Sequence, residues 1–175
     1  MAYGATIGFF DGVHKGHQHV VHRLQEACSA RGLHSMVVTF SNHPLTVVRP
    51  EAVPLMLCDN AVKEQKLRQC GADEVIMLPF TREMMQQSAY DFMRHVLRDR
   101  LGVRLLMLGY DNRFGRRQAG EGFEQYVEYG KEIGIEVIEG PRPEEAGLFE
   151  GKPVSSSLIR SLMAEGRTED AATLL

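Results

Sequence analysis

The sequence predicts an α/β protein built on a doubly wound parallel sheet. Apolar runs and helical patterns alternate along the chain, so that each expected strand is followed by an expected helix. Runs such as MVVTF and LLML are short and lack strict alternation of apolar and polar residues, which indicates strands buried on both faces. Helices packed on both faces of a parallel sheet provide that burial.

The expected strands and helices follow one another in a regular order. Strands are expected over residues 3–10 (YGATIGFF), 33–40 (LHSMVVTF), 72–80 (ADEVIMLPF), 103–110 (VRLLMLGY) and 135–140 (IEVIEG). Helices are expected from about residue 16 and around residues 61–70 (AVKEQKLRQC), 88–100 (SAYDFMRHVLRDR) and 122–134 (GFEQYVEYGKEIG). Each helix therefore supplies the crossover that a parallel sheet needs.

The rhythm changes in the tail, from Pro141 onward. FEGKPVSSS predicts a turn or hairpin that leads into a helix over SSSLIRSLMAEG, and TEDAATLL predicts a last short helix. We therefore expect a C-terminal hairpin and helical subregion beside the sheet. Because the 175 residues show no linker, repeat or low-complexity segment, we expect a single domain over residues 1–175.

The composition argues against several classes of protein. With 20 basic and 23 acidic side chains, no surface for nucleic acid is expected. No apolar run approaches the roughly 20 residues that cross a bilayer, and the N-terminus lacks the pattern of a signal peptide. We therefore expect a cytoplasmic protein with no membrane partner. Cys28, Cys58 and Cys70 are far apart, which favours reduced thiols over disulfides or a zinc cluster.

The stretch IGFFDGVHKGH places two histidines among glycines directly after the first expected strand. On a helix that starts near Gly16, His17 lies on the same face as the apolar residues that pack on the sheet, whereas His19 and His22 lie on the opposite face. A zinc site built from His14, His17, His19 and His22 would need both faces of one helix, so we expect His19 and His22 to be solvated instead.

His14 and His17 are predicted to lie at a phosphate-binding site. They stand at the start of a helix, above the carboxyl end of the first strand, where open α/β sheets bind ligands. Neighbouring glycines let the backbone approach a ligand, and the helix N-terminus offers free N–H groups and partial positive charge. The alternative is a tight turn with a half-buried His17. The loop matches neither the P-loop nor the dinucleotide-binding pattern.

FDGVHKGH resembles the HxGH motif of the nucleotidyltransferase superfamily, and more narrowly the GxFDGxHxGH motif of bacterial FAD synthetases. These form the FMN adenylyltransferase half of bifunctional riboflavin kinase/FAD synthetases. VVTFSNHP, LGYDNRFGRRQAG and VSSSLIR are similar to three further family motifs and occur in the family's order. The resemblance spans nearly the whole chain. It implies a Rossmann-like sheet of the nucleotidyltransferase type.

The resemblance implies a reaction of ATP with FMN that gives FAD and pyrophosphate by in-line displacement, with Mg²⁺ held by the ATP phosphates and water rather than by a protein site. It assigns catalytic roles to His14, His17 and Arg160. With an ordinary pKa of about 6.5, both histidines are expected to become cationic when ATP binds. The nucleotide-binding residues it implies are Gly8, Phe9, Phe10, Asp11, Gly12, Gly16, Gly109, Ser155, Ser156 and Ser157. The flavin-side residues it implies are His43, Asp111, Asn112, Arg113, Phe114 and Gly115.

Several of these residues also have a simpler interpretation. Ser155 or Ser156 is a natural N-cap, Phe9 or Phe10 a core residue, and Asp11 a residue that orients a histidine or the turn. The simpler interpretation of Arg160 is a surface arginine, and that of the loop RFGRR is a solvated basic loop without a partner. For Arg160 we favour phosphate binding because it stands beside a second expected anion site, the serine-capped helix start, in a chain that already has one at the histidines.

The chain departs from the family pattern at three positions and in length. Asn42 replaces a proline, Asn112 an aromatic residue and Ser157 a threonine. Loss of the aromatic residue at Asn112 bears on flavin selectivity. A riboflavin kinase domain follows in the bifunctional enzymes about where this sequence stops, so we expect no riboflavin phosphorylation by it. Two alternatives stay open: an HxGH nucleotidyltransferase with a different phosphate acceptor, and a non-catalytic protein that binds flavin or nucleotide.

Overall fold

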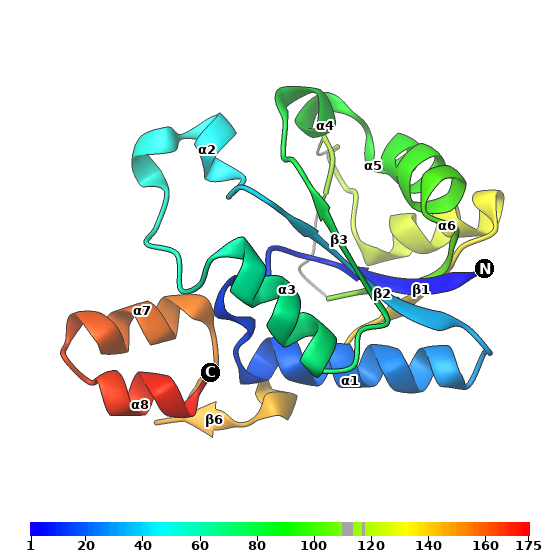
Figure 1. Ribbon diagram of the computed structural model, residues 1–175. Coiled ribbons are helices and arrows are strands. Elements are labelled where there is room, and N and C mark those ends of the chain that lie inside the picture. The colour runs from blue at the N-terminus through cyan, green and yellow to red at the C-terminus, as the bar shows by residue number, and fades with distance from the viewer. Residues whose placement is uncertain (110–113, 117) are drawn as a thin grey trace.

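A five-stranded parallel sheet forms the centre of the protein. The computed structural model describes residues 1–109, 114–116 and 118–175. The sheet contains β1 (Tyr3–Ile7), β2 (His34–Phe40), β3 (Glu74–Leu78), β4 (Val103–Leu108) and β5 (Glu136–Glu139), in the spatial order β3-β2-β1-β4-β5 (Figure 1). The chain therefore begins at the middle strand and winds outward in both directions, which confirms the predicted doubly wound topology.

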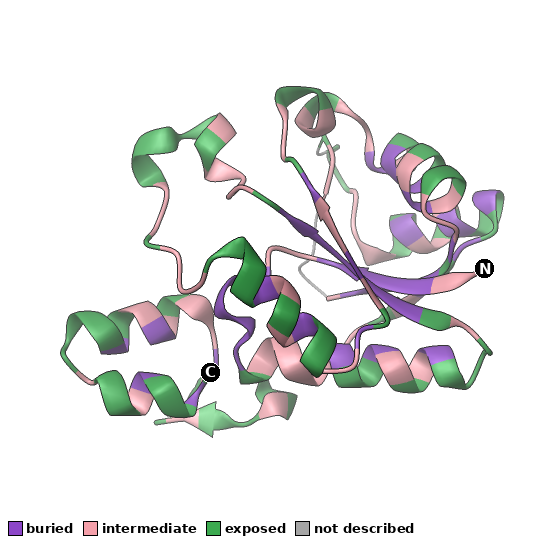
Figure 2. Ribbon diagram, in the orientation of Figure 1, coloured by how far each residue is buried: buried purple, intermediate pink, exposed green. Residues whose placement is uncertain are grey.

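Helices cover both faces of the sheet. On one face lie α1 (Lys15–Ser29) and α3 (Asn60–Gln69), and on the other lie the π-helical segment η3 (Phe92–Arg100) and α6 (Phe123–Ile133). Successive strand residues divide between the two faces, as period-2 geometry requires. Val38 and Leu106 pack with Phe92, whereas Val37 packs with Val21, and both faces are buried (Figure 2). This explains why the strands read as apolar runs without alternation.

The C-terminal subregion has the predicted hairpin and two helices. β6 (Leu148–Phe149) and β7 (Lys152–Pro153) pair antiparallel, and α7 (Ser156–Ala164) and α8 (Thr168–Thr173) follow. The two helices share a small apolar cluster centred on Ile159 and Leu162, apart from the sheet (Figure 1). A hydrogen bond from the Lys15 N–H to the Leu174 carbonyl, 2.9 Å long, ties this subregion to the start of α1.

Short elements add to the predicted pattern. They are η1 (Asp11–Val13), α2 (Leu45–Val48), η2 (Pro50–Ala52), α4 (Arg82–Gln86), α5 (Ala89–Asp91) and η4 (Pro143–Ala146). Each has at most five residues, too few to show a helical period. The first strand ends at Ile7 rather than at Phe10, because Phe10 adopts a left-handed backbone with φ 56°. In the part of the chain that is described, none of the helices has the length and apolar character to span a bilayer.

Candidate active site

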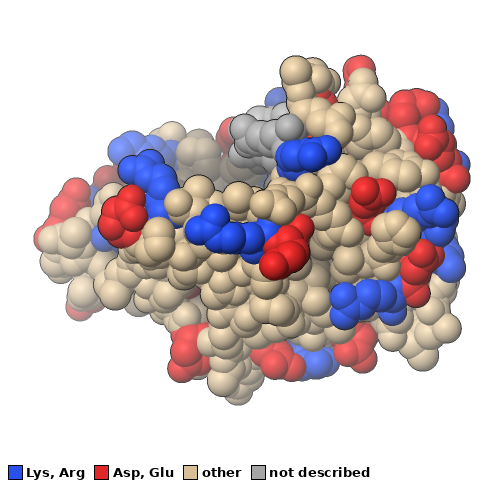
Figure 3. All heavy atoms as spheres, turned by 90° about the horizontal axis from the view of Figure 1, so that it is seen from above, with Lys and Arg blue, Asp and Glu red and all other residues tan. Residues whose placement is uncertain are grey.

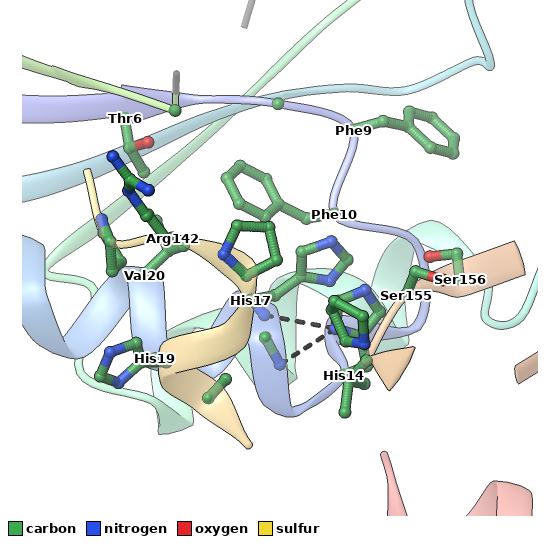
Figure 4. A pocket seen from close by; sticks show the side chains of 18 of the residues that line it. Thr6, Phe9, Phe10, His14, His17, His19, Val20, Arg142, Ser155 and Ser156 are labelled. Atoms are coloured by element: carbon green, nitrogen blue, oxygen red, sulfur yellow. Dashed lines mark hydrogen bonds between the residues drawn. The ribbon is translucent and has the colours of Figure 1, made fainter. Parts of the chain in front are cut away.

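A pocket of about 600 Å³ opens at the carboxyl ends of β1 and β4, where the order of the strands in the sheet reverses. Its walls come from five parts of the chain: residues 6–10, the first turns of α1, Gly109, and the segments 141–146 and 153–156 (Figure 4). This is the position at which open α/β sheets bind ligands. Seen from above, positive and negative side chains intermingle on the surface, so an anion would depend on local donors inside the pocket (Figure 3).

A tight turn carries the chain from β1 into α1. Phe10 (φ 56°) and Val13 (φ 46°) both adopt positive φ, which costs about 1–3 kcal/mol for each residue that is not glycine. Gly12 has φ 80°, and a Cβ atom there would lie 3.0 Å from the Leu57 side chain, so any larger residue would be strained. The turn is therefore strained and must be held by its surroundings.

The side chain of His14 caps α1 through its Nδ1 atom. Nδ1 accepts hydrogen bonds from the backbone N–H groups of Gly16 (3.1 Å) and His17 (3.3 Å) (Figure 4). A neutral imidazole that accepts at Nδ1 carries its proton at Nε2, so Nε2 is the donor that remains for a ligand. The His14 and His17 rings stack with their centroids 3.5 Å apart, and Phe10 packs edge-on against His17 at 5.1 Å.

Both imidazoles are neutral at pH 7 in the ligand-free protein. Burial lowers the pKa of His14 to about 4, and burial together with the His14 and Lys63 charges lowers the pKa of His17 well below its usual value. The pair therefore offers neutral N–H donors before an anion arrives. The predicted cationic pair concerns the ATP-bound protein and stays a prediction.

The N-terminus of α7 faces the same pocket. Ser155 caps this helix, with its Oγ accepting the Leu158 N–H at 3.0 Å, and Ser156 Oγ donates to the Asp11 carbonyl at 3.1 Å. Two helix N-termini, of α1 and α7, thus border one pocket and direct partial positive charge toward it. The capping and ligand-binding interpretations of these serines are compatible.

Arg160 lies outside the pocket and has two partners. Its guanidinium forms an ion pair with Asp11, and its Nε donates to the Leu55 carbonyl at 2.7 Å. Asp11 is 4% exposed and also accepts the Leu57 N–H at 3.0 Å. Asp11 therefore fastens residues 55–57 and α7 to the histidine turn, which fits the second of its two predicted roles, orienting the turn rather than a histidine.

A second cavity, of about 270 Å³ and mainly apolar, meets the first at residues 7–9. Its lining is Ile7, Gly8, Phe9, Phe40, Pro44, Phe80, Met84, Met85, Phe92, Phe114 and Gly115. Phe114 is stacked on Tyr126 at 5.1 Å, and Gly115 has φ 71° in close contact with the Gln87 backbone. The cavity thus has aromatic walls of a size that suits a planar ring system.

Most of the predicted residues come together at these two cavities. The lining of the larger pocket includes Gly8, Phe9, Phe10, His14, Gly16, His17, Gly109, Ser155 and Ser156. Phe114 and Gly115 line the smaller one. Asp111, Asn112 and Arg113 lie outside the described residues.

Besides Arg160, four predicted residues lie away from both cavities. Asp11 and Gly12 are buried within the turn itself, and Ser157 is exposed because it is one helical step past Ser156. His43 borders a third cavity, where its ring packs edge-on against Phe9 at 4.9 Å and its Nδ1 accepts the Leu45 N–H at 3.0 Å.

Sequence reasoning missed other residues at the site. His19, expected to be solvated, lines the larger pocket because η4 packs on that side of α1. Nδ1 of His17 and Nε2 of His19 are buried without a hydrogen-bond partner among the described residues. Arg142 also lines the pocket, and Lys63 is buried beneath the turn. These placements depend on contacts between distant segments, and no local pattern signals them.

The described residues contain no group of three His, Cys, Asp or Glu side chains positioned to hold a metal ion. Among the carboxylates near the turn, Asp11 is already occupied by Arg160 and by the Leu57 N–H.

Comparison with known proteins agrees with this geometry. A family model described as FAD synthetase matches residues 2–158. The bifunctional riboflavin kinase/FMN adenylyltransferase of Escherichia coli (strain K12) is 32% identical over 170 residues, and that of Pseudomonas fluorescens is 35% identical over 173 residues. The alignments cover 97% and 98% of this chain and 53% of each relative. The chain thus spans about half the length of these curated relatives.

Two solved structures show the same fold. A crystal structure titled as a macrolide-efflux protein from Streptococcus pneumoniae is 26% identical, with a TM-score of 0.83 over 99% of this chain and 56% of that one. Thermotoga maritima TmcAL, solved with alpha-thio ATP, has a TM-score of 0.62 at 15% identity, over 100% of this chain and 53% of that one.

The sheet order and the pocket at its switch point define a doubly wound α/β protein with a ligand site at the carboxyl edge of its sheet. With the family match and the relatives at 32–35% identity, the assignment is narrower. The chain belongs to the FAD synthetase family.

Proposed function

We propose that this chain transfers the adenylyl group of ATP to FMN, giving FAD and pyrophosphate. The observation that carries the proposal is the junction of two unlike cavities at residues 7–9. One has two imidazoles and two helix N-termini, which suit a polyphosphate, and the other has aromatic walls, which suit a flavin ring. The names of the relatives support ATP and FMN as the two substrates.

In this proposal, an oxygen of the FMN phosphate attacks the α-phosphorus of ATP. The new P–O bond forms as the bond to the bridging oxygen breaks, and pyrophosphate leaves on the opposite side. Such a displacement needs positioning and charge stabilisation rather than a protein nucleophile. Nε2–H of His14, the His17 imidazole and the N–H groups at the start of α1 and α7 would bind the phosphates as negative charge grows on the leaving group.

Arg160 is proposed to bind a β- or γ-phosphate oxygen. To do so it must exchange the Asp11 carboxylate for phosphate, since the two are paired in the ligand-free protein. Ser155 and Ser156 would stay in place as the cap of α7 and the link to the histidine turn.

ATP is proposed to act as its Mg²⁺ complex. The ion would be held by phosphate oxygens and water, because Mg²⁺ keeps several waters and commonly binds through substrate phosphates. When bound, it would neutralise phosphate charge.

The test is to incubate the chain with MgATP and, in separate reactions, FMN, riboflavin or phosphopantetheine. Pyrophosphate release and chromatography of the products identify the acceptor. FAD formed only with FMN is expected. A different acceptor would retain the nucleotidyltransferase and exclude the flavin, and no release with any acceptor would favour a non-catalytic binding protein. His17→Ala should lower turnover by about 100-fold, whereas His22→Ala, on the exposed side of α1, should act as the wild type.

A further inference from the structure

Lys63 belongs to none of the sequence motifs, yet its ammonium lies beneath the histidine turn. The residue is 2% exposed and projects from α3 toward the ends of β1 and β2. Nζ donates to the Phe9 carbonyl at 3.1 Å and to the Phe40 carbonyl at 2.8 Å. It also lies 4.1 Å from the centre of the Phe9 ring. A lysine side chain is rarely buried this deeply unless its ammonium has partners, and here two carbonyls and an aromatic ring provide them.

These contacts lie where the turn is least stable by itself. The Phe9 carbonyl immediately precedes Phe10, the first residue with positive φ. That carbonyl also accepts the hydroxyl of Thr39 at 2.8 Å, so two donors from different elements fix its direction. If Lys63 became apolar, the Phe40 carbonyl would lose this donor and the Phe9 carbonyl would keep Thr39 alone.

Phe9 is also the wall that three cavities share. It lines the larger pocket, the apolar cavity and the third cavity that contains His43. The Lys63 ammonium packs on one side of this ring, and the His43 ring packs on it edge-to-face. Movement of Phe9 would therefore change the boundary between the two proposed substrate cavities, besides loosening the turn that carries His14 and His17.

We propose that Lys63 is a positioning residue for adenylyl transfer: by holding the Phe9 carbonyl and ring, it fixes the histidine turn and the wall between the two substrate cavities. This inference rests on the proposed function for its effect on turnover. The positioning itself is a property of the protein without substrates. The two can therefore be tested separately.

The kinetic test compares Lys63→Met with Arg68→Met. Both variants remove one positive charge from α3, but Arg68 is exposed and pairs with Glu64 and Glu74 away from the turn. Lys63→Met should lower kcat by about 100-fold per folded molecule while the KM for ATP changes by about threefold or less, since misplacement affects the transition state most. Arg68→Met should match the wild type in both. Lys63→Arg, which keeps the charge and donors, should have a kcat at least about tenfold higher than that of Lys63→Met.

The substrate-free test uses nuclear magnetic resonance of the histidine side chains. The stacked rings of His14 and His17 should give a strong cross-ring contact in the wild type and in Arg68→Met, and a weakened one in Lys63→Met. An intact contact with wild-type kcat in folded Lys63→Met would overturn the proposal. A weakened contact in a chain whose wild type forms no FAD would instead support the positioning and count against the proposed function.

If Lys63→Met does not fold, Thr39→Val tests the same anchor. It removes the other donor to the Phe9 carbonyl with little change in shape. We then expect kcat to fall by about tenfold with an unchanged KM for ATP, together with a weaker ring contact. Wild-type values for both readouts in Thr39→Val would overturn the proposal.

Discussion

At the residue scale, single side chains at this site combine structural and chemical roles. His14 caps α1 through Nδ1, and this bond places its proton on Nε2, where a ligand can use it. Ser155 caps α7 while its helix N-terminus borders the same pocket. The capping hydrogen bonds therefore also orient the groups that face the ligand. The effect of a substitution on helix stability and its effect on turnover must be measured separately.

The buried histidines predict a loss of stability in acid. The unfolded chain protonates His14 near its usual pKa of about 6.5, whereas the folded state resists protonation until about pH 4. Between these values the unfolded state binds more protons, so the free energy of unfolding falls as pH falls, by roughly 3 kcal/mol for His14 alone. Urea unfolding from pH 7 to pH 4.5 measures this slope.

A matched pair of variants isolates the contribution of His14. His14→Asn keeps a good N-cap but removes the titrating ring, so the slope between pH 6.5 and 4.5 should become shallower. His22→Asn, on the exposed side of the same helix, should keep the wild-type slope. An unchanged slope in His14→Asn would show that other groups cause the acid sensitivity.

Gly16→Ala should separate activity from stability. A Cβ atom at Gly16 would lie 2.9 Å from Cε1 of His14, so the imidazole must move. Alanine favours a helix over glycine by about 1 kcal/mol, which offsets the weakened His14 cap, so stability should stay within about 1 kcal/mol of the wild type while kcat falls by about tenfold. Enzyme assays and thermal unfolding of the same sample measure both. Gly122→Ala, which meets no atom within 4 Å, should leave kcat unchanged; an equal loss there would contradict the argument.

At the element scale, the starts of α1 and α7 meet at one pocket although more than a hundred residues separate them. Asp11 joins them, since its carbonyl accepts from Ser156 and its carboxylate pairs with Arg160. The ion pair is largely shielded from water at its Asp11 end. Phosphate binding by Arg160 and the attachment of α7 to the turn are therefore expected to be coupled.

Arg160→Ala should leave the Asp11 carboxylate buried without its cation. Stability should then fall by about 2–4 kcal/mol, and the KM for ATP should rise if the arginine also binds phosphate. Adding Asp11→Asn removes the orphaned charge, so the double variant should regain part of the stability but none of the ATP affinity. Denaturant unfolding and calorimetric ATP titration provide the two values. Recovery of both together would mean that Arg160 acts only as a structural partner.

At the scale of the whole molecule, the repeating pattern of the sequence was enough to predict the architecture of the sheet. Contacts between distant segments could not be predicted from it. The alternation of apolar runs and helical patterns predicted the sheet, its parallel winding and the histidines at its carboxyl edge, because period and order are local properties. The partner of Arg160, the covering of His19 by η4 and the burial of Lys63 were not predictable. Each depends on a segment far away in the chain.

The two cavities on either side of Phe9 predict that the substrates can be weakened separately. Phe114 lines the apolar cavity and stacks on Tyr126, but it does not line the larger pocket. Phe114→Ala should therefore weaken FMN binding by about tenfold, because one aromatic contact with a ring contributes about 1 kcal/mol or more, and should leave ATP binding within about twofold. Calorimetric titration with each substrate alone measures both affinities. Phe149→Ala removes an aromatic ring that packs near Arg167, away from both cavities, and should change neither. Equal weakening of ATP and FMN in Phe114→Ala would mean that the two cavities act as one site, whereas an unchanged FMN affinity would remove the flavin ring from the apolar cavity.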